Sequence, residues 1–292
     1  MADIGIGIVG GGYMGKLHAA AFATVGTIFE TRLRPHLAMV AASSDASAER
    51  YRASYGFAKA TSDWRALVDD PSVGVVVIAS PQETHAEIAL AAMVQGKHVL
   101  CEKPLATTLA ECEAMVAAAE AAGVVNMTGF NYIKTPATQF ARKLITDGAI
   151  GQLTWFRGEH TEDFLANPET PLNWRTEGRS TGAMGDLSPH IIQCALALAG
   201  PIDELVANIV TLIPERPDGH GGSGQVTNDD AANMLCRFAN GASGELMVSR
   251  TASGRKMGYA YEVTGTEGAI RFDQEDQNAL WLYSAKGPEA ER

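Results

Sequence analysis

Several features that define other classes of protein are missing from this sequence. Nowhere in its 292 residues do 18 or more apolar residues follow one another, so we expect no membrane-spanning segment. The N-terminus has no basic stretch leading into a long apolar run, so we infer no secretory signal and expect a cytoplasmic protein. Basic residues are few: 23 Lys and Arg stand against 34 Asp and Glu, and the net charge of −11 disfavours nucleic acids and anionic membranes as partners.

Cysteine is scarce as well. None of the cysteines forms a C-x-x-C pair, and each falls within an expected strand or helix: Cys101, Cys112, Cys194 and Cys236. A disulfide framework or a thiolate metal site needs closely spaced or paired cysteines. We therefore expect four reduced thiols and no bound metal.

A glycine-rich stretch near the start of the chain organises the first half. An alternating apolar run before it predicts a strand, and an Ala-rich run after it predicts a helix. Between them Gly10, Gly12 and Gly15 have the G-x-G-x-x-G spacing, with Tyr13 and Met14 inside the motif. The first glycine permits a tight turn, the second lets a pyrophosphate approach the backbone, and the third lets the helix pack close to the strand. This context favours dinucleotide binding at a helix N-terminus over the alternative, an ordinary glycine-rich turn.

The adenosine ribose of a dinucleotide is expected at the end of the second strand, where Ser43, Ser44 and Asp45 follow one another. A carboxylate there bonds the ribose hydroxyls and repels a 2′-phosphate, whereas a small or basic residue admits the phosphate. Because Ser44 stands at the expected position with Asp45 beside it, NAD and NADP both stay open. The same residues also suit the N-cap of the next helix, and the two roles are compatible.

Strands and helices alternate as far as residue 128. This alternation predicts a parallel, doubly wound α/β sheet, and hence a dinucleotide-binding Rossmann domain over residues 1–128. Two of the expected strands end in polar residues at the edge where such sheets bind ligands. We expect cofactor contacts from these residues: Ser80, Pro81 and His85 after one strand, and Glu102 and Lys103 after the next.

From residue 129 onwards the pattern changes. An expected helix over residues 183–199 is followed by short strands in succession, and Asn240-Gly241 predicts a hairpin between two of them. We therefore expect a second domain over residues 129–292, of the α+β class, built on a large, open, mainly antiparallel sheet. An open sheet face needs cover, so we expect a homodimer or homotetramer paired through it. The glycine-rich segment 214–227 is expected to be a mobile loop.

Taken together, these motifs resemble one known family. The resemblance rests on the glycine motif, on Ser80-Pro81 with His85, and on three further stretches: residues 96–104, which end in Glu-Lys-Pro, 129–132, and 181–190. Over nearly its whole length the chain resembles the glucose–fructose oxidoreductase / inositol 2-dehydrogenase / rhizopine catabolism (Gfo/Idh/MocA) family. The resemblance implies reversible oxidation of a secondary alcohol on a sugar, cyclitol or related polyol by NAD or NADP, with Lys103, Asp186 and His190 lining the active site.

Family members commonly continue beyond this length, with further segments that return to the first domain. This sequence ends in a polar tail, residues 287–292. We therefore expect it to be truncated at the C-terminus.

The chemistry can also be argued from the residues. Hydride leaves a carbinol carbon only as the hydroxyl loses its proton, so an acid/base group is needed. Asp186 and His190 are four residues apart, and on one helix a carboxylate so placed can orient a histidine. Lys103 follows a parallel strand, where its ammonium can stabilise a developing alkoxide. We expect His190 to accept the proton and Lys103 to polarise the oxygen, while a desolvated lysine can also be the base. Taken singly, Lys103 is also typical of a solvated loop residue, and Asp186 with His190 is also typical of a pair on a helix surface.

Five further residues are expected to contact the substrate. Asn131 and Tyr132 lie just past the expected domain junction, and Asp163, Trp174 and Arg175 lie in the loop before the helix with Asp186. Trp174 offers an apolar face to a sugar ring but equally suits core packing. Arg175 equally suits a surface salt bridge.

We predict an NAD(P)-dependent dehydrogenase acting on CH–OH groups. A glycoside hydrolase of the same architecture is the first alternative; it keeps NAD bound and uses transient oxidation to ease elimination. Cofactor retained on purification, and free sugar released without net NADH, would identify it. A non-catalytic dinucleotide sensor is the second alternative, and Lys103, Asp186 and His190 argue against it because a sensor needs no acid/base set.

Overall fold

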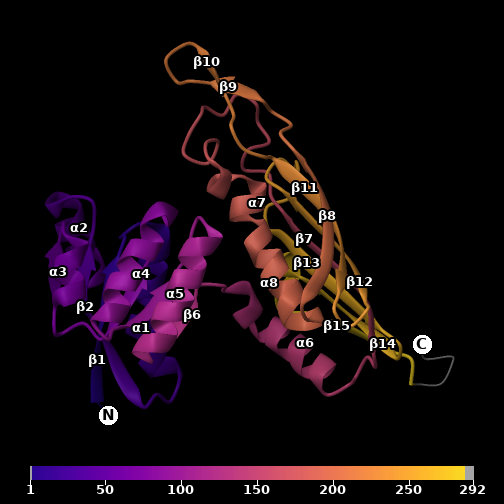
Figure 1. Cartoon of the computed structure of the whole chain (residues 1–292), viewed down its shortest axis with the longest axis horizontal. Helices are drawn as coiled ribbons and strands as arrows, with labels where there is room; N and C mark the ends of the chain where they lie inside the picture. The colour runs from indigo at the N-terminus through magenta and orange to yellow at the C-terminus, as the bar shows by residue number, and fades with distance from the viewer. Residues whose placement is uncertain (1, 287–292) are drawn as a thin grey trace. The chain divides into compact units, whose positions relative to one another are not determined.

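The computed structural model describes residues 2–286, apart from the side chain of Arg179. The chain divides into two compact units, Met1–Gly129 and Phe130–Arg292 (Figure 1). We describe each unit by itself. The expected polar tail, residues 287–292, lies outside the described residues.

The first unit is built on a parallel six-stranded sheet with the order β3-β2-β1-β4-β5-β6. Its strands are β1 (Ala2–Val9), β2 (Leu33–Ala41), β3 (Lys59–Thr61), β4 (Val75–Ile78), β5 (His98–Cys101) and β6 (Asn126–Thr128). The strand order reverses at β1, and ligands bind open α/β sheets at such a switch point. The predicted Rossmann fold is confirmed.

Helices follow the strands of this sheet. They are α1 (Tyr13–Ile28), α2 (Asp45–Tyr55), α3 (Trp64–Asp69), the 3₁₀ turn η1 (Gln82–Thr84), α4 (His85–Val94) and α5 (Leu109–Ala122). Thr108 and Glu111 form a capping box at the start of α5, and Gly123 ends the helix with a positive φ of 61°. The buried core consists of aliphatic residues from the strands and the inner helix faces, such as Ile8, Val77 and Ile88.

The second unit is built on a seven-stranded sheet with the order β15-β14-β13-β7-β12-β11-β8. Its strands are β7 (Leu153–Thr161), β8 (Ile202–Val210), β11 (Ala231–Phe238), β12 (Ser243–Ser249), β13 (Gly258–Gly265), β14 (Gly268–Asp273) and β15 (Trp281–Ser284). β7 and β12 run parallel, whereas every other neighbouring pair is antiparallel. This confirms the predicted mainly antiparallel sheet. Asn240-Gly241 makes the turn between β11 and β12, with a φ of +87° at Gly241.

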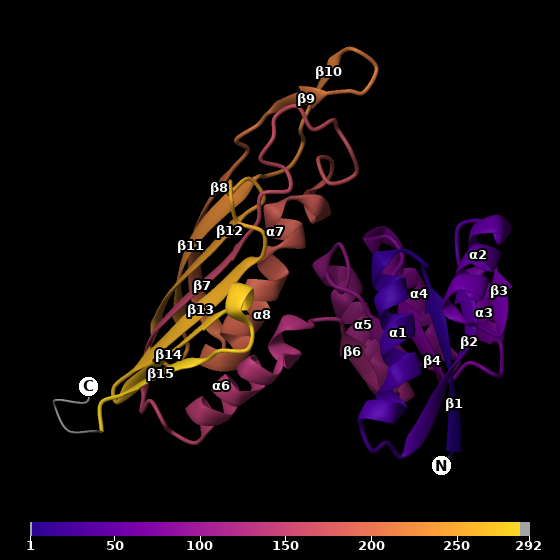
Figure 2. The ribbon, with the colours of Figure 1, turned by 180° about the vertical axis from the view of Figure 1, so that it is seen from behind.

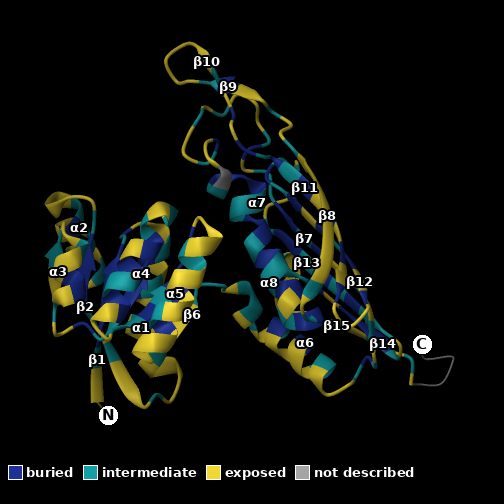
Figure 3. Ribbon diagram, in the orientation of Figure 1, coloured by how far each residue is buried: buried dark blue, intermediate teal, exposed yellow. Residues whose placement is uncertain are grey.

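Helices cover one face of this sheet. Figure 2 shows α6 (Pro136–Thr146), α7 (Ala183–Asp186) and α8 (Ser188–Ala199) on the same side of the strands. Ile191 and Cys194 of α8 are fully buried against sheet residues such as Phe156 and Val263. Burial alternates along β11 and β12, so every second residue points to the other, open face (Figure 3). Short 3₁₀ turns complete the unit: η2 (Tyr132–Lys134), η3 (Arg179–Thr181) and η4 (Gln274–Asp276).

Two expectations about local structure are wrong. The single helix expected over residues 183–199 is two helices, α7 and α8, with Leu187 between them. Pro189 has no N–H to donate to the carbonyl four residues earlier, so the helix is interrupted there. The expected mobile loop over residues 214–227 contains a two-stranded hairpin, β9 (Glu215–Pro217) and β10 (Ser223–Gln225). The buried Arg216 guanidinium holds this hairpin by donating to the carbonyls of Leu165 and Asn167.

Residues 2–286 contain no helix that is both long and apolar enough to cross a membrane. All four cysteines are free. Burial raises the pKa of the Cys101 and Cys194 thiols to about 12.

Candidate active site

The glycine motif leaves one side of the α1 N-terminus open. Gly10 has a φ of +98°, and a Cβ at Gly15 would lie only 1.9 Å from the carbonyl oxygen of Gly10. Both positions therefore require glycine. Gly12 caps α1, and a Cβ there would meet no atom within 4 Å. This open space beside the first N–H groups of a 16-residue helix fits the pyrophosphate of a dinucleotide. Tyr13 is exposed and Met14 half-buried in the first turn.

At the end of β2, the side chain of Ser44 performs the capping role considered above. Its Oγ accepts a hydrogen bond of 3.3 Å from the backbone N–H of Ser47, at the start of α2. Ser43, Ser44 and Asp45 are all exposed. Their contact with a ribose stays a prediction.

At the end of β4, the chain makes a tight turn that is closed by its own side chains. Ser80 Oγ lies 2.6 Å from Thr84 Oγ1, and the N–H of Thr84 donates to the Pro81 carbonyl at 2.9 Å. His85 is buried beside this turn. Its Nδ1 lies 2.9 Å from the Pro104 carbonyl and its Nε2 lies 3.0 Å from the Ser80 carbonyl. Both ring nitrogens thus face backbone carbonyls, and a contact of His85 with the cofactor stays a prediction.

At the end of β5, Glu102 and Lys103 face different surroundings. The carboxylate of Glu102 is buried and lies 2.7 Å from His18 Nε2 of α1. A Cβ at Gly129 would lie 2.7 Å from the same carboxylate, so the chain passes close over it. Lys103 is half-buried, and the peptide bond from Lys103 to Pro104 is cis.

In the second unit, Asp186 ends α7 beside two residues of the preceding loop. Arg175 Nε lies 3.9 Å from Asp186 Oδ2, and the Arg175 guanidinium stacks 4.1 Å from the centre of the Trp174 ring. Trp174 is 58% exposed, which excludes the core-packing alternative. The three side chains form an aromatic surface next to an ion pair, which suits a sugar ring and its hydroxyls.

His190 lies in α8 among aromatic rings. Its ring centre is 4.7 Å from that of Tyr132, 5.4 Å from that of His160 and 6.1 Å from that of Phe130. His160 is held in turn, with Nδ1 at 3.2 Å from the Leu187 carbonyl and Nε2 at 3.1 Å from Glu162. Burial raises the pKa of Tyr259, which stacks on Tyr132 at 4.5 Å, so this neighbour stays a neutral phenol. His190 therefore packs among the rings of Phe130, Tyr132 and His160.

A polar run that we did not predict holds the segment around Asp186. The side-chain amide of Asn228 donates at 3.0 Å to the carbonyls of Arg175 and Gly178. Asp229 Oδ2 accepts from the Met184 N–H at 2.7 Å, at the start of α7. In the sequence, only the three consecutive polar residues 228–230 before a strand could have indicated this role.

The third residue of that run takes part in a buried ion pair. Asp230 Oδ1 lies 2.8 Å from Arg250 Nε, and both side chains are at most 1% exposed. Arg250 also donates to the Arg175 carbonyl at 2.5 Å and to Asn228 Oδ1 at 2.7 Å. Arg250 and Asn228 thus both bind the Arg175 carbonyl and hold the backbone there.

Asp163 and Asn131 are the two remaining residues that we predicted to contact the substrate. Asp163 pairs with Lys256 at 2.6 Å and accepts from the Gly254 N–H at 3.1 Å. The hydrogen bond from Lys256 holds the pKa of the Asp163 carboxyl below its usual range. The Asp163 carboxylate thus links its own loop to the loop that contains Gly254 and Lys256. Asn131 is exposed at the start of η2.

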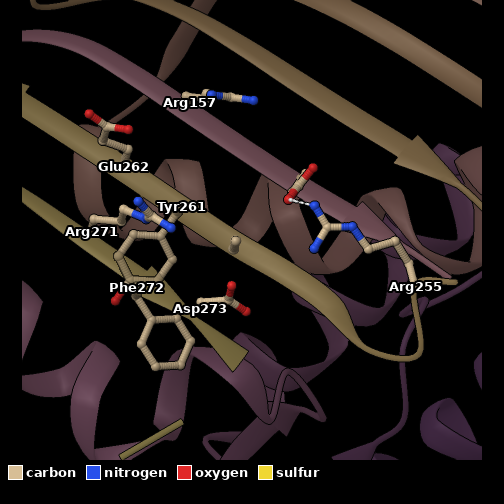
Figure 4. A pocket seen from close by; sticks show the side chains of 9 residues that line it. Arg157, Arg255, Tyr261, Glu262, Arg271, Phe272 and Asp273 are labelled. Atoms are coloured by element: carbon tan, nitrogen blue, oxygen red, sulfur yellow. Dashed lines mark ion pairs between the residues drawn. The ribbon is translucent and has the colours of Figure 1, made fainter. Parts of the chain in front are cut away.

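The open face of the sheet carries a polar hollow of about 300 Å³ (Figure 4). Arg157, Glu262 and Arg271 line it from neighbouring strands, and Arg255 reaches Glu159 at 3.7 Å. None of the predicted site residues lines this hollow. Within the described part of the chain, no group of three or more His, Cys, Asp or Glu side chains is placed to hold a metal ion.

The fold and these residues define a class: a two-domain oxidoreductase with a Rossmann unit for its nucleotide and an α+β unit on an open sheet. Comparison with known families identifies it further. Residues 4–130 match the oxidoreductase family with NAD-binding Rossmann fold (GFO_IDH_MocA), and residues 138–271 match the GFO/IDH/MocA C-terminal domain. The chain belongs to the Gfo/Idh/MocA oxidoreductase family, and the resemblance seen in its motifs is confirmed.

Several relatives have names that state an activity. Levoglucosan dehydrogenase of Pseudarthrobacter phenanthrenivorans is 40% identical over 98% of this chain and 77% of its own length. Myo-inositol 2-dehydrogenase of Thermotoga maritima is 30% identical over 98% of this chain and 80% of its own. The solved structure of levoglucosan dehydrogenase in complex with NADH and L-sorbose matches with a TM-score of 0.95, covering 99% of this chain and 78% of that one.

Proposed function

We propose that this protein is an NAD-dependent dehydrogenase that oxidises a secondary hydroxyl of levoglucosan or a closely similar anhydrosugar. The observation that carries the substrate class is the 40% identity with levoglucosan dehydrogenase over 98% of the chain. The structures of that relative in complex with NADH favour NAD over NADP. When bound, the nicotinamide accepts the hydride that leaves the carbinol carbon.

The cofactor's phosphates are bound at the N-terminus of α1, in the open space beside Gly12. The N–H groups of the first turn point out of the helix and carry a partial positive charge, which suits two phosphates. Ser44 faces the adenosine ribose while it caps α2. These roles follow from the open Gly12 position and the exposed Ser44 side chain.

His190 accepts the hydroxyl proton, and Lys103 stabilises the developing alkoxide. The rings of Tyr132 and His160 fix the orientation of the histidine, with centres at 4.7 and 5.4 Å from its own. A base held in one orientation loses no freedom when the substrate binds, and that lowers the barrier to proton transfer. Asp186 accepts hydrogen bonds from sugar hydroxyls, and Arg175 keeps the carboxylate in place at 3.9 Å.

Trp174 provides the surface on which the sugar ring stacks. Its ring is exposed on one side and stacks against the Arg175 guanidinium on the other, at 4.1 Å. Arg175 therefore fixes the aromatic surface as well as the carboxylate. Loss of the indole would weaken sugar binding more than it slows the chemical step.

We also propose that two copies pair through the open sheet face. Apolar side chains are exposed there on neighbouring strands, including Val206 at 65%, Leu235 at 62% and Met247 at 37%. Covering such a patch is a common reason for self-association. A cytoplasmic location stays a prediction.

The direct test is the absorbance of reduced nicotinamide while levoglucosan, myo-inositol, glucose and L-sorbose are offered with NAD⁺ and, separately, with NADP⁺. We expect reduction of NAD⁺ with levoglucosan at a kcat/KM at least about tenfold above that of the other sugars. Turnover of myo-inositol alone would reject the anhydrosugar but keep the dehydrogenase. Release of a hydrated or hydrolysed sugar without net NADH would reject the dehydrogenase itself.

A further inference from the structure

His85 stands between two backbone acceptors in the first unit. It is the first residue of α4, and 1% of its surface is exposed. Its Nδ1 lies 2.9 Å from the Pro104 carbonyl oxygen, and its Nε2 lies 3.0 Å from the Ser80 carbonyl oxygen. Both distances are those of ordinary N–H···O hydrogen bonds.

The two acceptors lie on the two nitrogen sides of the ring. A carbonyl oxygen only accepts hydrogen bonds, so a ring N–H is the donor in such a contact. The imidazole ring therefore spans the space between the Ser80 and Pro104 carbonyls.

The two acceptors also lie at the ends of neighbouring strands. Ser80 follows β4 and Pro104 follows β5, and these strands pair in parallel from Val75↔His98 to Ile78↔Cys101. The Ser80 side is rigid because Thr84 closes its turn with bonds to Ser80 and Pro81. The Pro104 side carries Lys103 as the preceding residue. His85 therefore connects a fixed turn to the backbone next to the proposed catalytic lysine.

We propose that His85 is a positioning residue: its ring spans the Pro104 and Ser80 carbonyls and so holds Lys103 in place for the reaction. This inference rests on the proposed function, in which Lys103 stabilises the alkoxide. His85 touches neither substrate nor cofactor and acts through the backbone of the strand exit. Its removal therefore affects the chemical step through Lys103, while the glycine motif keeps binding the nucleotide.

His85→Phe tests the proposal, because phenylalanine fills similar space but donates no hydrogen bond. The matched control is His98→Phe: His98 lies at the opposite end of β5, is half-buried, and accepts one bond of 3.1 Å from the Val125 N–H. Both variants lose a histidine bond to the backbone in the same unit. We expect His85→Phe to lower kcat about tenfold with NADH affinity within about threefold, and His98→Phe to leave kcat within about twofold.

The two substitutions are then repeated in a Lys103→Met background. If His85 acts through Lys103, His85→Phe changes the residual rate there by less than about twofold. An equal loss of rate with and without Lys103 would overturn the proposal while leaving the role of the lysine intact. If Lys103→Met itself leaves turnover unchanged, the proposed function fails at that residue, and the positioning role fails with it.

His85→Gln keeps the test independent of how well His85→Phe folds. Glutamine retains an N–H donor beside the same carbonyls, so we expect it to restore most of kcat. The melting temperatures of the variants show whether each is folded. A kcat of His85→Gln as low as that of His85→Phe, at an unchanged melting temperature, would overturn the proposal.

Discussion

His18 and Glu102 join the helix of the glycine motif to the strand exit that carries Lys103. They are 84 residues apart in sequence, yet His18 Nε2 lies 2.7 Å from Glu102 Oε1, with 17% and 8% of the two side chains exposed. A buried carboxylate must have hydrogen-bond donors, and His18 supplies one. The pair therefore fixes α1 and the end of β5 to one another within the Rossmann unit.

Replacing His18 by Phe leaves the buried Glu102 carboxylate without this donor. We expect the free energy of unfolding to fall by about 1–3 kcal/mol, measured by urea denaturation. His36→Phe is the control, because His36 is exposed on β2, and its cost should stay within about 0.5 kcal/mol. Equal losses in the two variants would show that the His18–Glu102 contact contributes nothing to stability.

Asp229 is expected to control turnover because it holds the start of α7, three residues before Asp186. Asp229→Ala removes the acceptor for the Met184 N–H, and we expect kcat to fall about tenfold. Asp229→Asn keeps an oxygen acceptor and should restore most of the rate.

The control for Asp229 is Asp218→Ala in the same unit. Asp218 also accepts from two backbone N–H groups, those of His220 at 2.7 Å and Gly222 at 3.0 Å, but in the β9–β10 turn. Both substitutions should cost about 1 kcal/mol of stability, as the loss of a cap does. If Asp218→Ala lowers kcat as much as Asp229→Ala, the effect is one of stability and not of position.

Ser44→Asp tests which ribose the protein accepts. Aspartate caps a helix as well as serine does, so the melting temperature should not change. Its carboxylate repels a 2′-phosphate, and we expect NADP⁺ to bind at least about tenfold more weakly while NAD⁺ binds as before. Isothermal titration with each nucleotide measures the two affinities. Parallel changes in both would show that Ser44 does not face the ribose.

Asp70 makes the stability of the first unit depend on pH, because its contribution is lost in acid. Hydrogen bonds from Lys59, at 2.6 Å, and from Ser72 lower the pKa of its carboxyl to about 2. Since this pKa lies below that of the unfolded chain, the contribution is fully present above about pH 4 and is lost as the pH falls through about 2.

We expect Asp70→Asn to lower the free energy of unfolding by about 1–2 kcal/mol at pH 7, because the half-exposed Lys59 is partly screened by solvent. The difference from the unaltered chain should vanish near pH 2. Urea denaturation at several pH values measures it. A difference that is the same at pH 7 and pH 2 would contradict the pKa of Asp70.

The parts of the fold that could be predicted from the sequence are those that local patterns encode. The strand before Gly10, the helix after Gly15 and the hairpin at Asn240-Gly241 depend on periodicity and on backbone conformations that neighbouring residues decide. The alternation of strands and helices then fixed the class of the first unit. The domain boundary that we expected after residue 128 stays a prediction. The structure divides into its two compact units after Gly129.

Contacts between distant residues could not be predicted in this way. The β9–β10 hairpin depends on Arg216 reaching carbonyls 49 and 51 residues away, and nothing near Arg216 in the sequence indicates them. The break at Leu187 is different, because it has a local cause in the sequence: Pro189 lacks the N–H that a continuous helix needs there. For the candidate site, residue types indicated Lys103, Asp186 and His190, whereas His18, Asp229 and Arg250 act through partners that only the folded chain brings close.

In the proposed reaction, hydride passes from a sugar carbon to NAD⁺ with the help of Lys103 and His190. The most direct measurement follows deuterium from levoglucosan labelled at its carbinol carbons, in the unaltered chain and in Lys103→Met and His190→Asn. We predict deuterium in the reduced nicotinamide, with the rate of transfer falling at least about a hundredfold in each variant while NADH still binds. Deuterium absent from the nicotinamide, or transfer at an unchanged rate in both variants, would contradict this reaction.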